Sequence, residues 1–134
     1  MAGRNIEIIL GVLAAAVRTQ DPGHIRGILG DELVWEGTEP GTRCDGPEQA
    51  MGIIRNRFAA APLTVDALEV IDAGEHVVVG LRGPGFNGIP GDVETPGQIY
   101  NVVTFRSGKI IRWRDYGTRE RALAAASATD PRWQ

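Results

Sequence analysis

Hydrophobic residues change their spacing about halfway along the chain. In the first half they recur every three or four positions, which is the period of an α-helix that buries one face. Asp21-Pro22 is a typical start of a helix, and Pro62 is a typical stop. The pattern predicts helices over residues 5–20, 22–30 and 47–61, with a short strand over 32–36 and a loop over 37–45 between the second and the third.

After residue 62, apolar and polar positions alternate with the period of two that is typical of β-strands. The segment 83–96 interrupts this alternation with glycines and prolines, and we predict that it is a loop. We expect strands over residues 63–72, 75–82, 97–106 and 109–116, followed by a short helix over 118–127 and a loose tail over 128–134.

Helices in the first half and a meander of strands in the second predict an α+β fold. We expect one domain, residues 1–134, with its core within 5–127. The three helices of the N-terminal half would pack on the concave face of a curled antiparallel sheet, which gives a cone-shaped barrel with a short C-terminal helix. The open end of such a cone is a natural pocket for a small molecule.

The composition excludes several classes of function. The chain carries a net charge of −3, whereas a nucleic-acid surface needs a basic stripe. A single cysteine, Cys44, excludes an internal disulfide, and with only two histidines we expect no metal site and no cofactor. No apolar run reaches the ~20 residues of a membrane span, and no leader pattern opens the chain, so we expect a cytoplasmic protein that does not bind membranes.

The strand predicted over 109–116 carries the most informative pattern. Its alternation places Ile111, Trp113 and Asp115 on one face. If this face points into the core, a carboxylate ends an apolar row in a partly dry place, where its pKa rises and it can exchange protons near neutral pH. We therefore predict that Asp115 is a catalytic base or acid. The alternative is a structural aspartate that ends the strand and pairs with a nearby arginine.

Two further polar residues are predicted to lie near Asp115. Arg82 is in phase with Val78 on its strand, and it is expected either to pair with Asp115 and stabilise an oxyanion or to be a surface arginine. Asn101 shares a face with apolar residues, and a buried amide needs partners. It would orient Asp115, a water or a ligand, or else be a satisfied structural residue.

Aromatic residues at core spacing are predicted to line the pocket, because pocket walls and core overlap in such a fold. The loop 83–96 is expected to close over the pocket as a lid, through apolar residues that include Phe86. The predicted substrate-binding residues are Trp35, Phe58, Phe86, Asn101, Phe105 and Trp113.

The opposite face of the late strands mixes apolar, aromatic and arginine side chains. A surface of this kind is typical of a protein interface, so we expect a homodimer. The residues on this face are Tyr100, Val102, Thr104, Ile110, Arg112, Arg114 and Tyr116.

Over roughly residues 5–126 the chain resembles the SnoaL-like branch of the nuclear transport factor 2 superfamily. The resemblance rests on the runs Val34-Trp35-Glu36, Gly46-Pro47-Glu48-Gln49-Ala50 and Gly108-Lys109-Ile110-Ile111-Arg112-Trp113-Arg114-Asp115-Tyr116. It implies a cone-shaped α+β barrel that is usually a homodimer. Members of the superfamily include polyketide cyclases, ketosteroid isomerases and epoxide hydrolases, and the fold alone does not choose among these activities.

The final strand is most similar to that of the limonene-type epoxide hydrolase branch, in which a Trp-Arg-Asp-Tyr run supplies a pocket aspartate. This similarity implies that Asp115 acts in the pocket. The same branch has an Arg-x-Asp pair on an earlier strand. Here Arg82 matches the arginine, whereas Pro84 stands in place of the aspartate.

The sequence therefore predicts a cofactor-independent acid/base enzyme that acts on a small apolar molecule of cyclic, polyketide-like or terpenoid type. Epoxide opening, isomerisation and cyclisation all need such a pocket aspartate, and the residues do not separate them. Two alternatives remain open. One is a small-molecule-binding protein without turnover, and the other is a dimeric accessory module, which predicts a filled cone without a cavity.

Overall fold

The structure of the chain is a computed structural model. It describes residues 2–38, 43–60, 67–73, 76–83 and 97–126. The elements are α1 (Ala2–Thr19), α2 (Gly23–Arg26), β1 (Leu29–Glu36), β2 (Arg43–Asp45), α3 (Pro47–Ala60), β3 (Ala67–Ala73), β4 (His76–Arg82), β5 (Gln98–Arg106), β6 (Lys109–Tyr116) and α4 (Arg119–Ala126).

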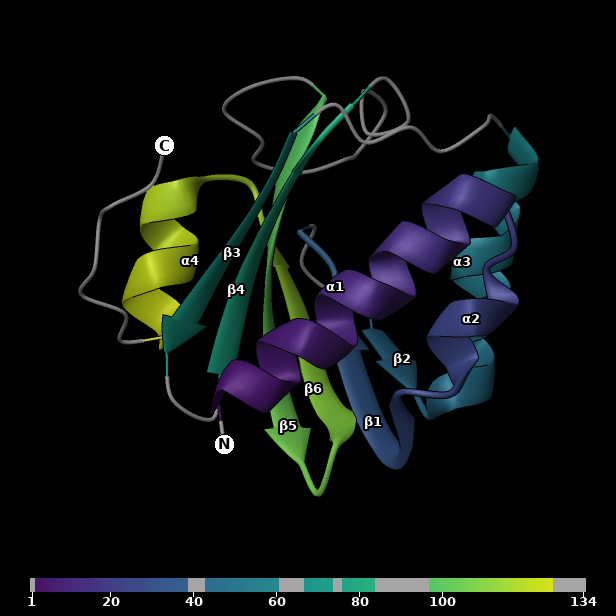
Figure 1. Ribbon diagram of the computed structural model, residues 1–134, viewed down its shortest axis with the longest axis horizontal. Helices are drawn as coiled ribbons and strands as arrows, with labels where there is room; N and C mark the ends of the chain where they lie inside the picture. Colours follow the sequence, from purple (N-terminus) through teal and green to yellow (C-terminus); the bar gives the residue numbers. More distant parts are fainter. Residues whose placement is uncertain (1, 39–42, 61–66, 74–75, 84–96, 127–134) are drawn as a thin grey trace.

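The strands form one curled sheet in the order β2-β1-β6-β5-β4-β3, as Figure 1 shows. Strands β3 to β6 make the antiparallel meander that the sequence predicts. Strand β1 pairs with β2 in antiparallel fashion and with β6 in parallel fashion. Because β2 and β3 are the two edges of the sheet, the cone is curled but not closed. The predicted α+β class is confirmed.

Helices cover both faces of this sheet. Helices α1, α2 and α3 lie on the concave face, and α4 lies against the opposite face (Figure 1). The main core fills the space between the sheet and the first three helices, where Ile9, Leu33, Met51, Val103 and Ile110 are each at most 2% exposed. This core surrounds the residues that form the candidate site.

A second, smaller core lies between the sheet and α4. It joins Val78, Tyr100 and Val102 of the sheet to Ala122 and Ala126 of the helix. Strands β4 and β5 are therefore buried on both faces, which is the physical reason for continuous apolar runs in their sequences.

A buried ion pair fixes α4 to the sheet. Nε and Nη2 of Arg119 donate hydrogen bonds of 3.1 and 3.0 Å to the two carboxylate oxygens of Glu69 on β3. Burial raises the pKa of Glu69, and the hydrogen bonds and charge of Arg119 oppose this rise. Glu69 is only 6% exposed, and within the described part of the chain Arg119 is the cation that pairs with its carboxylate.

Three local predictions from the sequence are wrong. The helix expected over 22–30 ends at Arg26, because the chain enters β1 at Leu29. The loop expected over 37–45 contains β2, in which Cys44 pairs with Trp35. The third error concerns Ile110. The sequence pattern predicts that it lies on the outer face of β6, whereas in the structure it is fully buried in the main core.

A β-bulge explains the position of Ile110. Thr104 pairs with Arg112, whereas the next residue, Phe105, pairs with Ile110. Ile111 is therefore an extra residue in β6, and it lies at the outer face while Ile110 turns inward. A bulge shifts the alternation of side chains by one position, so the phase of the strand changes in its middle.

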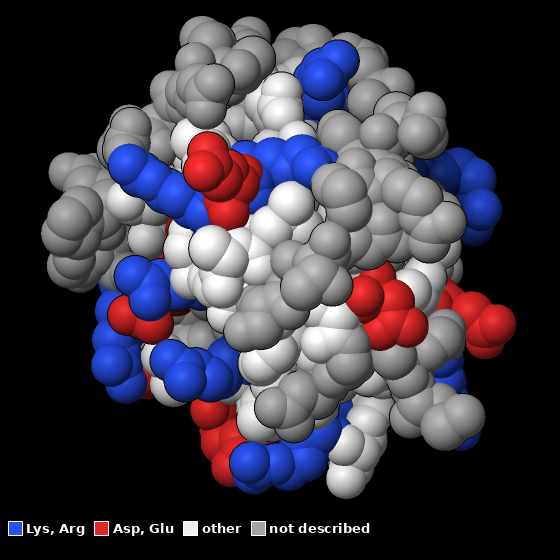
Figure 2. All heavy atoms as spheres, turned by 90° about the vertical axis from the view of Figure 1, so that its left-hand side faces the viewer, with Lys and Arg blue, Asp and Glu red and all other residues white. Residues whose placement is uncertain are grey.

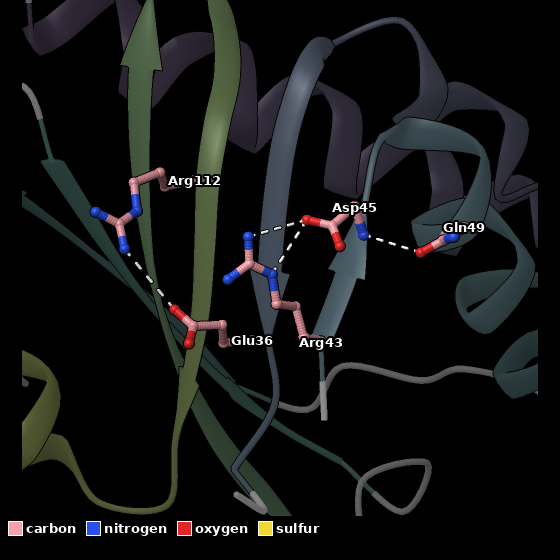
Figure 3. A network of polar contacts seen from close by, with 5 residues as sticks. All are labelled: Glu36, Arg43, Asp45, Gln49 and Arg112. Atoms are coloured by element: carbon pink, nitrogen blue, oxygen red, sulfur yellow. Dashed lines mark hydrogen bonds and ion pairs between the residues drawn. The ribbon is translucent and has the colours of Figure 1, made fainter. Parts of the chain in front are cut away.

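The exposed part of the outer sheet surface carries charges of both signs. An ion pair of 3.8 Å joins Arg112 to Glu36, and another of 3.0 Å joins Arg43 to Asp45, as Figure 3 shows. Seen from the side of α4, acidic and basic side chains lie next to one another (Figure 2).

Within the part of the chain that the structure describes, no helix is long and apolar enough to cross a membrane.

Candidate active site

Asp115 lies in a buried polar cluster on the concave side of the sheet. Its strand pairs with β5 so that Asp115 stands opposite Asn101. Asn101 Nδ2 donates a hydrogen bond of 2.6 Å to Asp115 Oδ1, and Trp113 Nε1 donates one of 3.1 Å to the same oxygen. Asp115 and Asn101 are each 4% exposed. The two donors therefore hold the carboxyl group in one orientation inside an apolar core.

The second carboxyl oxygen of Asp115, Oδ2, has a different environment. Among the described residues, no side chain or backbone group donates a hydrogen bond to it. An ionised carboxylate has room for several donors on its two oxygens. Oδ2 is thus the atom of this group that is left to interact with a bound molecule.

Burial raises the pKa of Asp115 from 3.8 to about 6. Loss of hydration is the largest cause, and the positive charge of Arg57 and the N–H groups of Trp35, Asn101 and Trp113 act against it. At pH 7 the group is mostly ionised, yet it can take up a proton at little cost. This is the range in which a carboxyl group works well as a catalytic base or acid.

Trp35 presents a buried donor at the same place. The side chain is 5% exposed, and its Nε1 has no hydrogen-bond partner among the described residues. The N–H group is near enough to Asp115 to lower the pKa of the carboxyl, but it does not reach hydrogen-bond geometry. Buried donors without partners are rare in folded proteins, and the carboxyl of Asp115 is the acceptor toward which this N–H acts.

Arg57 supplies a positive charge that the sequence analysis did not select. Its guanidinium lies over the ring of Trp35, 5.5 Å from the centroid, and its charge acts on Asp115. Arg57 follows the buried Ile54 by three positions on α3 and directly precedes Phe58. This helical spacing puts Arg57 beside the apolar stripe of α3. The spacing is therefore the sequence signal that could have identified Arg57 as a residue near the pocket.

A cavity of about 60 Å³ adjoins this cluster. Its walls include the rings of Trp35 and Trp113, whose centroids are 5.3 Å apart, together with Phe58, Arg57 and Asn101. One water needs roughly 10–15 Å³ of such space, and typical ligand pockets begin near 300 Å³. The cavity therefore accepts several waters or one small chemical group. The hypothesis of an accessory module predicts a filled cone, and this cavity argues against it.

The structure brings most of the residues selected from the sequence to one place. Trp35, Phe58, Asn101 and Trp113 line the cavity, and two of them bind Asp115 directly. Phe105 is buried in the main core, 6% exposed, but it is not on the cavity wall. Phe86 and the proposed lid lie outside the described residues.

The predicted pairing of Arg82 with Asp115 is wrong. Arg82 is exposed at the end of β4, opposite Gln98. It is in phase with Val78, which packs toward α4, and therefore points to the face of the sheet opposite Asp115. Of the two roles the sequence allowed for Arg82, the position in the structure fits the surface arginine.

Cys44 lies on β2 beside Trp35 and is buried. Burial is the main cause that raises the pKa of its thiol, and the negative charges of Asp45 and Asp115 add to this effect. A thiol with a raised pKa is a poor nucleophile.

The described residues contain no group of three or more side chains suited to hold a metal ion.

The chain belongs to the family of SnoaL-like domains, whose model matches residues 12–113. This match covers most of the chain, from the middle of α1 to the strand that carries Asp115. No curated protein matches the chain.

Solved structures with the same fold come from several bacteria. An NTF2-like protein of unknown function from Mesorhizobium loti has a TM-score of 0.65 and 22% identity, with 86% of this chain and 91% of that chain covered. A candidate SnoaL-like polyketide cyclase from a Jannaschia species has a TM-score of 0.61 and 21% identity, with 96% and 94% covered.

A third similar structure holds a ligand. It is a protein with a ketosteroid isomerase-like fold from Catenulispora acidiphila in complex with trimethylamine, with a TM-score of 0.57, 22% identity, and 94% and 96% of the two chains covered. At these identities the likeness shows the fold and not the activity. The fold is one that suits small-molecule binding, isomerisation or cyclisation.

Proposed function

We propose that this protein is a cofactor-independent acid/base enzyme that acts on a small, largely apolar molecule, with Asp115 as the catalytic residue. The observation that carries the proposal is the state of the Asp115 carboxyl group. Its Oδ1 is fixed by Asn101 and Trp113, its Oδ2 accepts no hydrogen bond from the described residues, and its pKa is about 6.

In this proposal Oδ2 exchanges a proton with the substrate. The ionised carboxylate removes a proton from an acidic carbon and later returns it to a different carbon, which completes an isomerisation. In a cyclisation, the carbanion formed instead attacks a carbonyl carbon of the same molecule and closes a ring. The carbonyl π bond breaks, and the alkoxide oxygen takes the proton back from Asp115, which restores the ionised carboxylate. A positioned base contributes a factor of roughly 10²–10⁴ to the rate.

The size of the cavity limits which part of a substrate reacts. About 60 Å³ does not hold a whole steroid or polyketide, so only the reacting end of such a molecule would enter the cavity. A water can occupy the same cavity. Epoxide opening by an activated water is therefore a second reaction of the same site, and terpenoid epoxides belong among the test compounds.

The experiment is a thermal-shift screen of the wild type and of Asp115→Asn against cyclic enones, polyketide intermediates, steroids and small epoxides. Each stabilising compound is then tested for turnover by mass spectrometry. The proposal predicts a compound that stabilises both proteins and is converted only by the wild type. If Asp115→Asn converts the compound at the wild-type rate, Asp115 is not the catalytic residue.

A second candidate function is the binding of a small molecule without turnover. The two tryptophan rings and the buried carboxylate favour a small amine, because aromatic faces and carboxylates attract ammonium groups. The trimethylamine complex of the similar protein from Catenulispora acidiphila supports the same class of ligand. This candidate predicts saturable binding of trimethylammonium that Asp115→Asn weakens, and no product from any compound in the screen.

We also propose a homodimer that uses the outer face of the sheet. Tyr100 is covered by α4 and would not take part, whereas Val102, Ile111, Arg112 and Arg114 line an outer groove. Sedimentation should give a dimer at micromolar concentration for the wild type, and Ile111→Asp should dissociate it by burying a charge. A monomeric wild type at that concentration contradicts the proposal.

A further inference from the structure

Arg57 is a cation at the wall of an apolar cavity, and it has no anionic partner among the described residues. No hydrogen bond or ion pair joins its guanidinium to any other described residue. Several other arginines in the described part do form ion pairs. Most of these pairs lie on the exposed surface, and one is the partly buried pair between Arg119 and Glu69. Arg57 is instead held against the face of Trp35, which leaves its N–H donors available at the cavity.

The ring of Trp35 supports the Arg57 guanidinium, whereas its buried N–H acts on Asp115 and is not turned to the cavity. A guanidinium offers several N–H donors in one plane and can bind both oxygens of a carboxylate. Among the described residues of the wall, Ile54, Phe58, Leu81 and Ile99 are apolar. Asn101 and Trp113 already donate hydrogen bonds to Asp115, which leaves Arg57 as the donor for a ligand.

We propose that Arg57, held against the ring of Trp35, forms an anion-binding position in the cavity, and that the natural ligand is a small organic anion, such as a carboxylate, with an apolar body. This inference deepens the proposed function because it names the substrate class for the same cavity. The anionic group lies against Arg57, and the apolar body lies along the apolar side chains of the cavity wall. The part of the ligand nearest Asp115 then faces Oδ2.

The charges around the cavity are consistent with this assignment. Among the described residues of the cavity wall, Arg57 from α3 is the charged one. Asp115 from β6 lies next to the wall residues Asn101 and Trp113 and forms no ion pair with Arg57 in the described part of the chain. The thiol of Cys44 on β2 is neutral, because its pKa is raised. An anion at Arg57 would partly offset the positive charge that now lowers the pKa of Asp115, so binding should favour the protonated acid.

The test uses acetate and its neutral analogue acetamide as probes, because they have nearly the same shape and differ in charge. The signal is the indole N–H resonance of Trp35 in nitrogen-15 NMR spectra, assigned with a Trp35→Phe variant. Ionic strength is held constant, since salt screens charge. We expect a saturable shift with acetate, with a Kd of about 1–10 mM, and a much smaller effect of acetamide.

Variants of α3 separate the anion position from general charge effects. Arg57→Gln should weaken acetate binding by about tenfold or more, and Arg57→Lys should restore part of it. Arg55→Gln removes an exposed arginine two positions away and should bind acetate like the wild type. Asp115→Asn should bind acetate at least as tightly, because it removes a nearby negative charge.

The outcomes distinguish this inference from the proposed function. Unchanged acetate binding by Arg57→Gln, equal binding of acetamide, or no saturable shift with acetate would overturn the anion position. A shift with trimethylammonium but not with acetate would overturn it in favour of an amine ligand. Loss of turnover in Asp115→Asn, together with any of these results, would leave the proposed acid/base function standing without the anion.

Discussion

The buried carboxyl group of Asp115 should make the folded protein less stable as the pH rises. The pKa of Asp115 is about 6 in the folded protein, against 3.8 as its ordinary value. Between these values the folded chain holds more protons at this site than the unfolded chain, so the free energy of unfolding falls as pH increases. Asp115→Asn has nearly the same shape, can still accept both hydrogen bonds, and does not titrate.

The pKa difference sets the magnitude. One pKa unit corresponds to about 1.4 kcal/mol. Relative to acid pH, the raised pKa of Asp115 therefore lowers the free energy of unfolding by about 3 kcal/mol at pH 8 and by about 2 kcal/mol at pH 5. The difference in stability between Asp115→Asn and the wild type should grow in favour of the variant by about 1 kcal/mol from pH 5 to pH 8.

Urea unfolding followed by circular dichroism at pH 5, 6.5 and 8 measures this difference. Comparing the two proteins at each pH cancels the titration of the groups they share. Asp31→Asn is the matched control for net charge, because Asp31 is an exposed aspartate on β1. A variant-minus-wild-type difference that stays constant across this range, or that moves against the variant, would refute the reasoning that Asp115 titrates with a raised pKa.

Three other substitutions test the surroundings of the site and the second core. Trp113→Phe removes one donor to Asp115 Oδ1, so the pKa of Asp115 should rise further and the acid limb of any pH–rate profile should move to higher pH; an unchanged profile would contradict this role. Gly80→Ala places a Cβ 2.6 Å from Cε2 of Tyr100 and should lower the free energy of unfolding by about 1–3 kcal/mol in denaturant titrations. Arg119→Met leaves the buried carboxylate of Glu69 without its partner and should cost about 3 kcal/mol at pH 8, with a smaller loss at pH 5, where the Glu69 carboxyl is more easily protonated.

The sequence predicted the elements and the fold class because periodicity carries that information directly. The change from helical to alternating spacing separates α1–α3 from the meander β3–β6, and the final strand pointed to Asp115. Asn101 could be placed beside it because it alternates with Ile99 and Val103 along the strand 97–106, and β5 pairs with β6 so that Asn101 stands opposite Asp115. Strand β2 was missed because three residues, Arg43-Cys44-Asp45, are too few to show a period.

The errors at Arg82 and Ile110 have definite physical causes. The run Val77-Val78-Val79 is buried on both sides, so it has no alternation from which the phase of Arg82 could be read. The bulge at Ile111 depends on how β5 and β6 pair, which a single strand does not reveal. Arg57 was passed over because an arginine near an apolar stripe usually reaches solvent, and only the contact with Trp35 places it at the cavity.

The central claim is that Asp115 exchanges a proton near neutral pH inside this cavity. Its most direct test is the titration of the Asp115 carboxyl carbon by carbon-13 NMR, assigned with Asp115→Asn, in the free protein and with a stabilising compound from the screen. The account predicts a midpoint at about pH 6 that moves when the compound binds. A midpoint near the ordinary value of 3.8, unaffected by any compound, would contradict it and make Asp115 a structural residue.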